Sequence, residues 1–216
     1  MKSKSITLQR IKEIYNNREP GSEKDFRFFS VLVPLVEIDG ELNVLYEVRG
    51  SKLERQPGEI CFPGGAVEAG ETHEQCAVRE TCEELGIDYS DIELIGEMDT
   101  IYTNNNYCIF CFLGVLSEEC LERLMPSEVE VAEVFLVPLQ YLYDNPPEVY
   151  VNVFKPTVDE NFPAERVVGG EPYKWRQGRT LVPVYDEYDG HTIWGHTARI
   201  TKLFVEVIKE RMGADV

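Results

Sequence analysis

The stretch of residues 64–87 constrains this chain more than any other part of it. It opens with two glycines and continues through residues 72–85, whose pattern predicts a helix that ends at a following glycine. Within this helix, Glu80, Glu83 and Glu84 stand at positions i, i+3 and i+4. Side chains at this spacing share one helix face, so the pattern predicts three carboxylates within a few ångströms of one another.

Carboxylates at this spacing repel one another, so a compensating cation is expected beside them. Ligation by oxygen alone favours Mg²⁺ or Mn²⁺. Magnesium keeps several waters and is commonly shared between carboxylates and substrate phosphates, which indicates a shallow site for a pyrophosphate. The alternative is a solvated helix face, and this is the more frequent role of helical glutamates when their neighbours are ignored.

The neighbouring residues favour the metal site. The stretch resembles the box of the Nudix hydrolase family, G-x5-E-x7-R-E-U-x-E-E-x-G-U, where U is usually apolar. One soft departure is Thr81 at the first U position. Every fixed position is matched, by Gly65, Glu71, Arg79, Glu80, Glu83, Glu84, Gly86 and Ile87.

The resemblance implies a role for each charged residue of the box. Glu80 and Glu84 are implied as the principal metal ligands, and Glu83 as a further ligand or the base that activates a water. Arg79 and Glu71 are implied as a pair that orients the helix. An Arg fork can hold a carboxylate through two hydrogen bonds and so fix a loop against a helix start. An ordinary surface ion pair is the alternative, and it would contribute little.

A wider resemblance covers most of residues 30–210 and is to the coenzyme A diphosphatase branch of the family. That branch carries a motif upstream of the box, L-L-T-x-R-S-x3-R-x3-G-x3-F-P-G-G, associated with coenzyme A recognition. The matching residues are Arg49, Gly58, Phe62, Pro63, Gly64 and Gly65. The departures are Tyr46 and Glu47 for Leu-Thr, Gly50 for Ser, and Glu54 for Arg, with Arg55 one position later.

These motifs suggest four substrate-binding residues. Arg49 and Arg55 are candidates for binding substrate phosphates, because the planar guanidinium matches phosphate geometry; ordinary surface charge is the alternative. Gly64 and Gly65 suit a connection where backbone closely approaches metal or phosphate, although a generic turn would also use them.

One acidic residue outside the box is a further candidate ligand. Glu130 precedes the predicted strand 131–137 and resembles the additional acidic residue that Nudix enzymes bring from elsewhere in the chain, with Glu133 and Glu128 as weaker alternatives. The histidines are not spaced as a zinc set and are expected to be structural or exposed: His73, His191 and His196.

The remaining pattern predicts one domain of the α+β class over residues 1–216, and the family resemblance implies an α/β/α sandwich with a mixed sheet. The expected hairpins are 28–38 with 42–48 and 181–188 with 191–194. Further strands are expected at 59–62, 92–98, 107–116 and 131–137, and short helices at 117–125 and 138–143. The remaining expectations are an N-terminal helix within 1–25 that packs on the domain edge, a loop or insertion at 155–179, and a C-terminal helix at 196–212.

The composition of the chain limits the classes of molecule that it is expected to bind. A formal net charge of −18 and a pI of about 4.6 argue against nucleic-acid binding, which depends on lysine and arginine. The sequence shows neither a long apolar run nor an apolar signal core, so we expect a cytoplasmic protein that does not bind membranes. The six cysteines are expected to be reduced and mostly buried.

Together these features predict a Mg²⁺- or Mn²⁺-dependent hydrolase of a pyrophosphate bond in a nucleoside diphosphate derivative. Coenzyme A or an acyl-coenzyme A is the expected substrate, giving 3′,5′-ADP and 4′-phosphopantetheine. Other activities that use the same box are pyrophosphatases of ADP-ribose, NADH or a nucleotide sugar. A nucleotide sensor without catalysis and a simple cation-binding protein are two further alternatives. By analogy with the family, a homodimer is expected.

Overall fold

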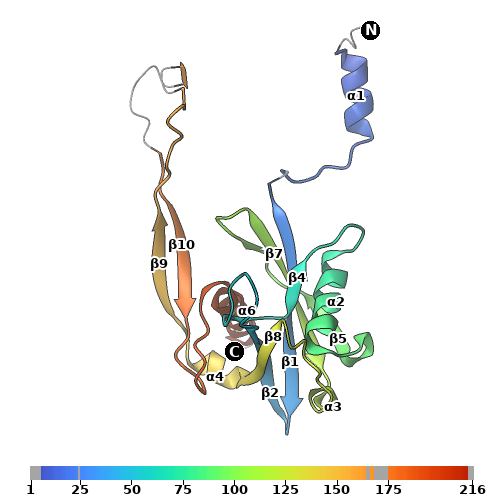
Figure 1. Cartoon of the computed structure of the whole chain (residues 1–216), viewed down its shortest axis with the longest axis vertical. Coiled ribbons are helices and arrows are strands. Elements are labelled where there is room, and N and C mark those ends of the chain that lie inside the picture. The colour runs from blue at the N-terminus through green and yellow to red at the C-terminus, as the bar shows by residue number, and fades with distance from the viewer. Residues whose placement is uncertain (1–5, 24, 164–165, 168–174, 214–216) are drawn as a thin grey trace.

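A computed structural model describes residues 6–23, 25–163, 166–167 and 175–213. A mixed sheet forms its centre (Figure 1). The strands are β1 (Arg27–Ile38), β2 (Glu41–Arg49), β3 (Ile60–Cys61), β4 (Gly64–Ala66), β5 (Ile92–Glu97), β6 (Ile101–Tyr102), β7 (Tyr107–Leu116), β8 (Val131–Pro138), β9 (Glu148–Phe154) and β10 (Gly178–Val184). The helices are α1 (Leu8–Asn16), α2 (His73–Leu85), the 3-10 helix η1 (Tyr89–Asp91), α3 (Glu118–Leu121), α4 (Leu139–Asp144) and α6 (Gly195–Gly213).

The main sheet is mixed because its two central strands, β1 and β7, run parallel. The other pairings are antiparallel: β2 joins β1, β3 and β8, while β5 and β6 join β7. The short strand β4 pairs with the start of β1, which brings Gly65 opposite Ser30. The α+β class and the mixed sheet are confirmed.

The hairpin of β1 and β2 follows the predicted boundaries closely. Asp39 and Gly40 form its turn, both with positive φ, at 52° and 82°. Such a turn twists with the strands it connects, which fixes the register of Ile38 opposite Glu41. The register then decides which β2 side chains face each side of the sheet.

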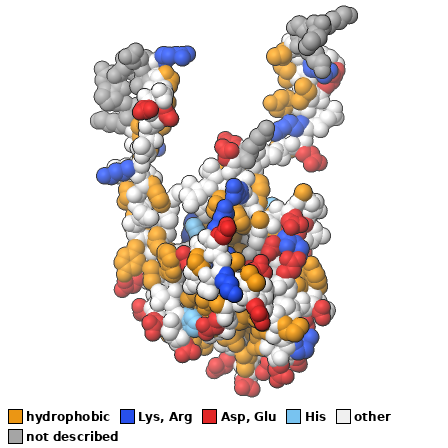
Figure 2. Space-filling model, viewed as in Figure 1, with side chains coloured by type: hydrophobic (Ala, Val, Ile, Leu, Met, Phe, Trp, Pro, Cys, Tyr) orange, Lys and Arg blue, Asp and Glu red, His pale blue; other side chains and the backbone are white. Residues whose placement is uncertain are grey.

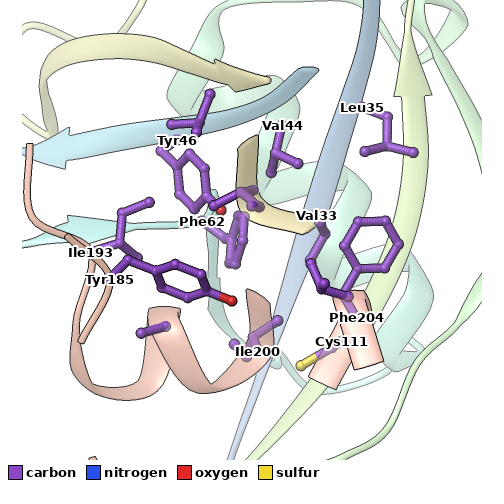
Figure 3. Close-up of a cluster of buried hydrophobic side chains, with 14 of the residues drawn as sticks. Val33, Leu35, Val44, Tyr46, Phe62, Cys111, Tyr185, Ile193, Ile200 and Phe204 are labelled. Carbon is purple, nitrogen blue, oxygen red and sulfur yellow. The ribbon is translucent and has the colours of Figure 1, made fainter. Parts of the chain in front are cut away.

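The sheet separates two apolar layers. On one side, Val44 and Tyr46 of β2 pack with residues of α6 such as Ile200 (Figure 3). On the other side, Leu45 packs with Leu85 of α2. Successive β2 side chains therefore point alternately to α6 and to α2, as a regular strand requires. This arrangement is the predicted α/β/α sandwich.

Two expectations for the helices need correction. The N-terminal helix forms, but α1 has no buried residue and stands away from the domain edge on which it was expected to pack (Figure 1). Its amphipathic period indicates an apolar stripe without specifying a partner. The helix expected at 117–125 is only α3, because the chain then turns to let the Met125 amide donate to the Leu85 carbonyl at the end of α2.

The second predicted hairpin forms only in part: its turn and the pairing next to the turn are present, but its first strand pairs mainly elsewhere. β10 pairs along its length with β9, a strand that the sequence reading did not assign. Around the predicted turn, Val184 bridges Trp194 and Tyr188 bridges His191, and the Tyr185 amide donates to the Ile193 carbonyl. β9 is a better partner because its seven residues offer a continuous hydrogen-bonding edge.

The predicted loop or insertion at 155–179 follows β9 and ends within β10. Residues 164–165 and 168–174 of it lie outside the described residues. β9 and β10 form a two-stranded ribbon that projects from the main sheet (Figure 1). Hydrophobic side chains are exposed along this ribbon (Figure 2), among them Val151, Phe154 and Leu181.

All six cysteines are unpaired thiols, five of them buried and Cys61 half-buried, as expected. Cys108 and Cys111 lie three positions apart on the same strand, β7, so their side chains leave opposite faces of the sheet. Among the residues that the structure describes, no helix is long and apolar enough to cross a membrane.

Candidate active site

Helix α2 carries the box glutamates, and its two ends are fixed locally. The Thr72 side chain accepts from the Gln75 amide, and the Gln75 side chain accepts from the Thr72 amide, which is a capping box. At the other end Gly86 has φ 67°, a left-handed conformation that glycine adopts without strain. The buried face, including Ala77 and Leu85, packs on the sheet. This packing sets the direction in which the glutamates project.

Glu80 and Glu84 point to the two glycines of β4. The Gly64 amide donates to Glu84 Oε2 over 2.7 Å. A Cβ atom at Gly65 would come within 2.2 Å of the Glu80 carboxyl carbon, and one at Gly64 within 2.3 Å of the Ser30 carbonyl oxygen. A side chain at Gly65 would collide with Glu80 of α2, and one at Gly64 would collide with the backbone of β1. The glycines therefore serve close packing of backbone against the carboxylates, while their contact with substrate stays a prediction.

Arg79 holds Glu71 with the predicted fork. Its Nε donates to Glu71 Oε2 over 3.0 Å and its Nη2 to Glu71 Oε1 over 2.9 Å. Glu71 also accepts from the Glu68 amide, which ties the loop before α2 to the same carboxylate. The Arg79 hydrogen bonds are the main cause that lowers the pKa of Glu71 to about 2. The pair thus orients the loop relative to the helix.

The three box glutamates do not form a single cluster. Arg79 Nη1 lies 2.9 Å from Glu80 Oε1 and 3.1 Å from Glu83 Oε2. Glu83 is 59% exposed, whereas Glu84 is buried. Within the described parts of the chain, no three His, Cys, Asp or Glu side chains form a ready coordination shell. The predicted convergence therefore applies to Glu80 and Glu84, while Arg79 holds Glu83 at the rim.

Glu130 approaches this site from the turn before β8. The Gly50 amide at the end of β2 donates to the Glu130 carbonyl over 2.7 Å. A Cβ atom at Gly50 would lie 2.1 Å from the Val129 carbonyl oxygen, so the turn can approach only a glycine here. The charge of Glu130 contributes to raising the pKa of both Glu80 and Glu84. The structure therefore brings Glu130 near the box glutamates.

The two weaker candidate ligands, Glu133 and Glu128, have no comparable interaction with the box glutamates among the described residues. Glu133 instead lies 3.3 Å from His191 Nε2 and lines a different pocket of about 460 Å³ with Trp194. Glu128 is exposed on the turn. The rings of His191 and His73 stack on Phe135 and Phe110, as expected of structural histidines.

Glu47 is the residue that the sequence reading missed as a member of the site. It is 1% exposed near the end of β2, and the charges of Glu84 and Glu130 act on it. Burial is the main cause that raises its pKa well above the ordinary value. The available signal was one acidic residue inside an otherwise apolar strand, Val44 to Val48. Such a charge is rarely buried unless it is paired or binds a cation.

The two candidate arginines differ in position. Arg49 lies near the carboxylates, since its charge lowers the pKa of both Glu47 and Glu84. Its Nε donates to the Arg55 carbonyl over 3.4 Å, so Arg55 contributes backbone here while its side chain is exposed. Arg49 is therefore better placed than Arg55 to meet a substrate phosphate bound beside these carboxylates.

The electrostatics of the site fit a bound cation. Burial raises the pKa of Glu84 to about 7, and the neighbouring Glu80 and Glu130 act in the same direction against the hydrogen bond from Gly64. Burial also raises the pKa of Glu80, against the effect of Arg79. The carboxylates offer oxygen ligands, and among the described residues Glu47 Oε1 is buried without a hydrogen-bond partner. A hard divalent cation is the group that such oxygens prefer.

Comparison with known proteins agrees with this geometry. The NUDIX domain profile matches residues 26–155, which is more than half of the chain. The chain belongs to the Nudix family. Members of this family generally use divalent metal ions, which accords with the acidic site described above.

Two Nudix relatives carry informative names. The "Peroxisomal coenzyme A diphosphatase NUDT7" of Mus musculus is 37% identical over 123 residues, covering 56% of this chain and 50% of that protein. The "Mitochondrial coenzyme A diphosphatase NUDT8" of Homo sapiens is 29% identical over 181 residues, covering 83% of this chain and 68% of that protein. The chain thus spans about half the length of the first of these relatives.

A MutT/nudix family protein from Enterococcus faecalis aligns over 94% of this chain and 70% of that chain, with 18% identity and a TM-score of 0.49. A likeness at this level adds nothing on activity, so the family assignment rests on the sequence match.

Replacing Arg79 with lysine should lower kcat by about tenfold or more, because an ammonium cannot hold both Glu71 oxygens and also reach Glu80 and Glu83. Steady-state kinetics and Mn²⁺ titration would measure the effect, with circular dichroism to confirm folding. Arg123→Lys is the matched control, since Arg123 pairs with Asp91 on the surface. Equal kinetics for Arg79→Lys and Arg123→Lys would show that the fork does not position the site.

Proposed function

We propose that this Nudix protein is a metal-dependent hydrolase that cleaves the pyrophosphate bond of a nucleoside diphosphate derivative. The observation that carries the proposal is the set of carboxylates from three elements: Glu80 and Glu84 of α2, Glu47 of β2, and Glu130 of the turn before β8. The charges of Glu80 and Glu130 act on buried Glu84, the charge of Glu130 acts on Glu80, and the backbone at Gly64 and Gly65 packs against Glu84 and Glu80. A solvated helix face does not require such packing.

Each residue has a distinct role in this proposal. Glu80, Glu84 and Glu130 would hold the cation, which supplies charge neutralisation on the phosphate oxygens and a lower pKa for a bound water. Glu83 remains accessible at the rim, where it serves as a further ligand or accepts the proton of the attacking water. Arg79 and Glu71 position the helix and its preceding loop. Arg49 would bind a substrate phosphate through its guanidinium.

Coenzyme A or an acyl-coenzyme A is the proposed substrate, cleaved to 3′,5′-ADP and 4′-phosphopantetheine. Support comes from the names of two relatives and from the upstream motif residues around Arg49 and Gly58. Two departures from that motif have structural roles in this chain: Tyr46 belongs to the core, and Gly50 admits the turn that bears Glu130. Because both substituted positions serve packing, the substitutions do not remove the residue proposed to bind the substrate phosphate, which is Arg49.

The test is a substrate panel with product identification by chromatography. Purified protein would be incubated with coenzyme A, ADP-ribose, NADH and a nucleoside triphosphate, each with Mg²⁺ or Mn²⁺. We expect 3′,5′-ADP and 4′-phosphopantetheine from coenzyme A. Faster cleavage of ADP-ribose or NADH would move the substrate to another Nudix class. Binding without any product would instead identify a nucleotide sensor.

The pH dependence of stability should be unusual in the metal-depleted protein. The pKa of Glu84 is raised by burial to about 7 in the folded protein, above its unfolded value of 4.5. The folded state therefore holds its proton more tightly, and stability falls as pH rises from about 4.5 to about 7 and then levels off. The expected decline is about 1–3 kcal/mol.

Urea denaturation with a chelator at several pH values would measure this decline. Glu84→Gln removes the titrating group, so it should flatten the profile, although Glu47 adds to the decline in the same direction. A wild-type profile that rises steadily from pH 5 to pH 7 would contradict the assignment of a protonated, buried Glu84.

We also propose the homodimer and retain the cytoplasmic location as a prediction. The exposed apolar side chains of α1 and of the β9–β10 ribbon support a further packing surface. Light scattering coupled to size-exclusion chromatography would decide the oligomeric state, and imaging of the tagged full-length protein would decide the location.

A further inference from the structure

Glu47 points to the same face of the sheet as α2. Leu45, two positions earlier in β2, belongs to the same buried cluster as Leu85 of α2, while Val44 and Tyr46 face α6. Strand alternation therefore directs Glu47 to the α2 side. Its cross-strand partner Cys61 lies beside it, and Phe62, which follows Cys61, faces the α6 layer. Glu47 thus lies under the site from the strand side, opposite the glutamates that come from the helix.

The environment of Glu47 does not satisfy its carboxylate. Within the part of the chain that the structure describes, Oε1 is buried with no hydrogen-bond partner, and Oε2 has only the Cys61 thiol at 4.0 Å. Arg49 is the cationic side chain that acts on it, and the acidic side chains around it are Glu84 and Glu130. A buried carboxylate in this condition is strongly unfavourable for folding. A residue kept for packing alone would be better served by an apolar side chain of the same size.

We propose that Glu47 is an additional ligand of the metal centre, bound directly or through one of the cation's waters. This inference rests on the proposed function, since it requires a cation between α2 and the end of β2. A cation placed among Glu47, Glu84 and Glu130 would satisfy the free oxygen and offset the repulsion among the three carboxylates. Magnesium and manganese accept such mixed shells of carboxylates and water.

Metal titration of the full chain tests the proposal. Mn²⁺ binding would be followed by calorimetry and by electron paramagnetic resonance of free Mn²⁺, without substrate. Glu47→Gln should raise the Kd by about tenfold, equivalent to ~1.4 kcal/mol. Glu84→Gln should weaken binding at least as much. Glu74→Gln, an exposed acid on the first turn of α2, is the control and should bind as wild type.

Thermal denaturation separates a ligand from a merely structural residue. Without metal, Glu47→Gln should have a higher Tm than wild type, because it removes a buried acid that must either carry an unpaired charge or hold its proton, with one oxygen left without a partner. With saturating Mn²⁺, wild type should gain more in Tm than the variant does. Glu47→Met, of similar volume, should show the same two changes, so the test does not depend on one variant that folds.

The outcomes also separate this inference from the proposed function. If Glu84→Gln loses Mn²⁺ affinity while both Glu47 variants bind as wild type, the ligand role of Glu47 is overturned and the Nudix site stands. If neither Glu84→Gln nor the Glu47 variants changes Mn²⁺ affinity, the metal centre itself is misplaced. Weakened binding in both, with the reversed Tm effect for Glu47, supports the proposal.

Discussion

Glu84→Gln is expected to lower kcat by about hundredfold or more while the protein stays folded. Glu84 is buried between α2 and β4, so the loss of its negative charge cannot be compensated by solvent. The substituted amide oxygen can still accept from the Gly64 amide, which preserves the local structure. The reduced charge weakens cation binding at the point where charge must be neutralised in the reaction.

Steady-state kinetics on the best substrate of the panel, over a range of Mg²⁺ and Mn²⁺ concentrations, would measure this effect. Glu74→Gln on the same helix is the control, because its side chain is exposed and projects from the first turn. A turnover of Glu84→Gln close to that of Glu74→Gln at saturating metal would rule out Glu84 as a ligand needed for catalysis.

Tyr46→Ala is expected to destabilise the protein by about 3–5 kcal/mol. The ring is completely buried and stacks on Phe62 and Phe135 at centroid distances of 4.8 and 5.5 Å. Its hydroxyl donates to Thr201 Oγ1 over 3.0 Å, which joins β2 to α6. Truncation to alanine opens a cavity between sheet and helix and removes these contacts together. Urea denaturation of the metal-depleted protein would measure the change.

Tyr46→Phe divides this loss into its parts. It retains the stacked ring and removes only the hydroxyl, so it should cost about 0.5–1.5 kcal/mol. Thr201 still donates to the Thr197 carbonyl, so no donor is left unpaired. If Tyr46→Ala were no more destabilising than Tyr46→Phe, the aromatic stack would not be a major part of the core.

The features that could be predicted from sequence depend on local chemistry. The Asp39-Gly40 turn and the alternation of β2 specify a hairpin without help from distant residues. The same holds for α2, whose end at Gly86 follows from the conformational freedom of glycine. The Arg79–Glu71 fork was also expected, from the resemblance to the Nudix box, and it joins the middle of α2 to the loop that precedes the helix.

The errors came from contacts between distant segments. β10 pairs along its length with β9 rather than with residues 191–194, which were its predicted partner. α1 has an apolar stripe, but none of its residues is buried. Glu83 shares a helix face with Glu80, yet Arg79 holds it at the rim. In each of these cases the local pattern is compatible with more than one partner, and the choice depends on which surfaces meet in three dimensions.

The sequence by itself determined the family, the box helix and the acidic chemistry of its face, because helix spacing and capping are local properties. Only the tertiary structure decided which carboxylates share the site. Glu47 is 33 residues before Glu80 in the chain, as their numbers show. The two reach one site because Leu45 of β2 and Leu85 of α2 share a buried cluster, and strand alternation turns Glu47 to the same face of the sheet as Leu45. Burial and the free carboxylate oxygen of Glu47 arise from that packing, so no local pattern could reveal them.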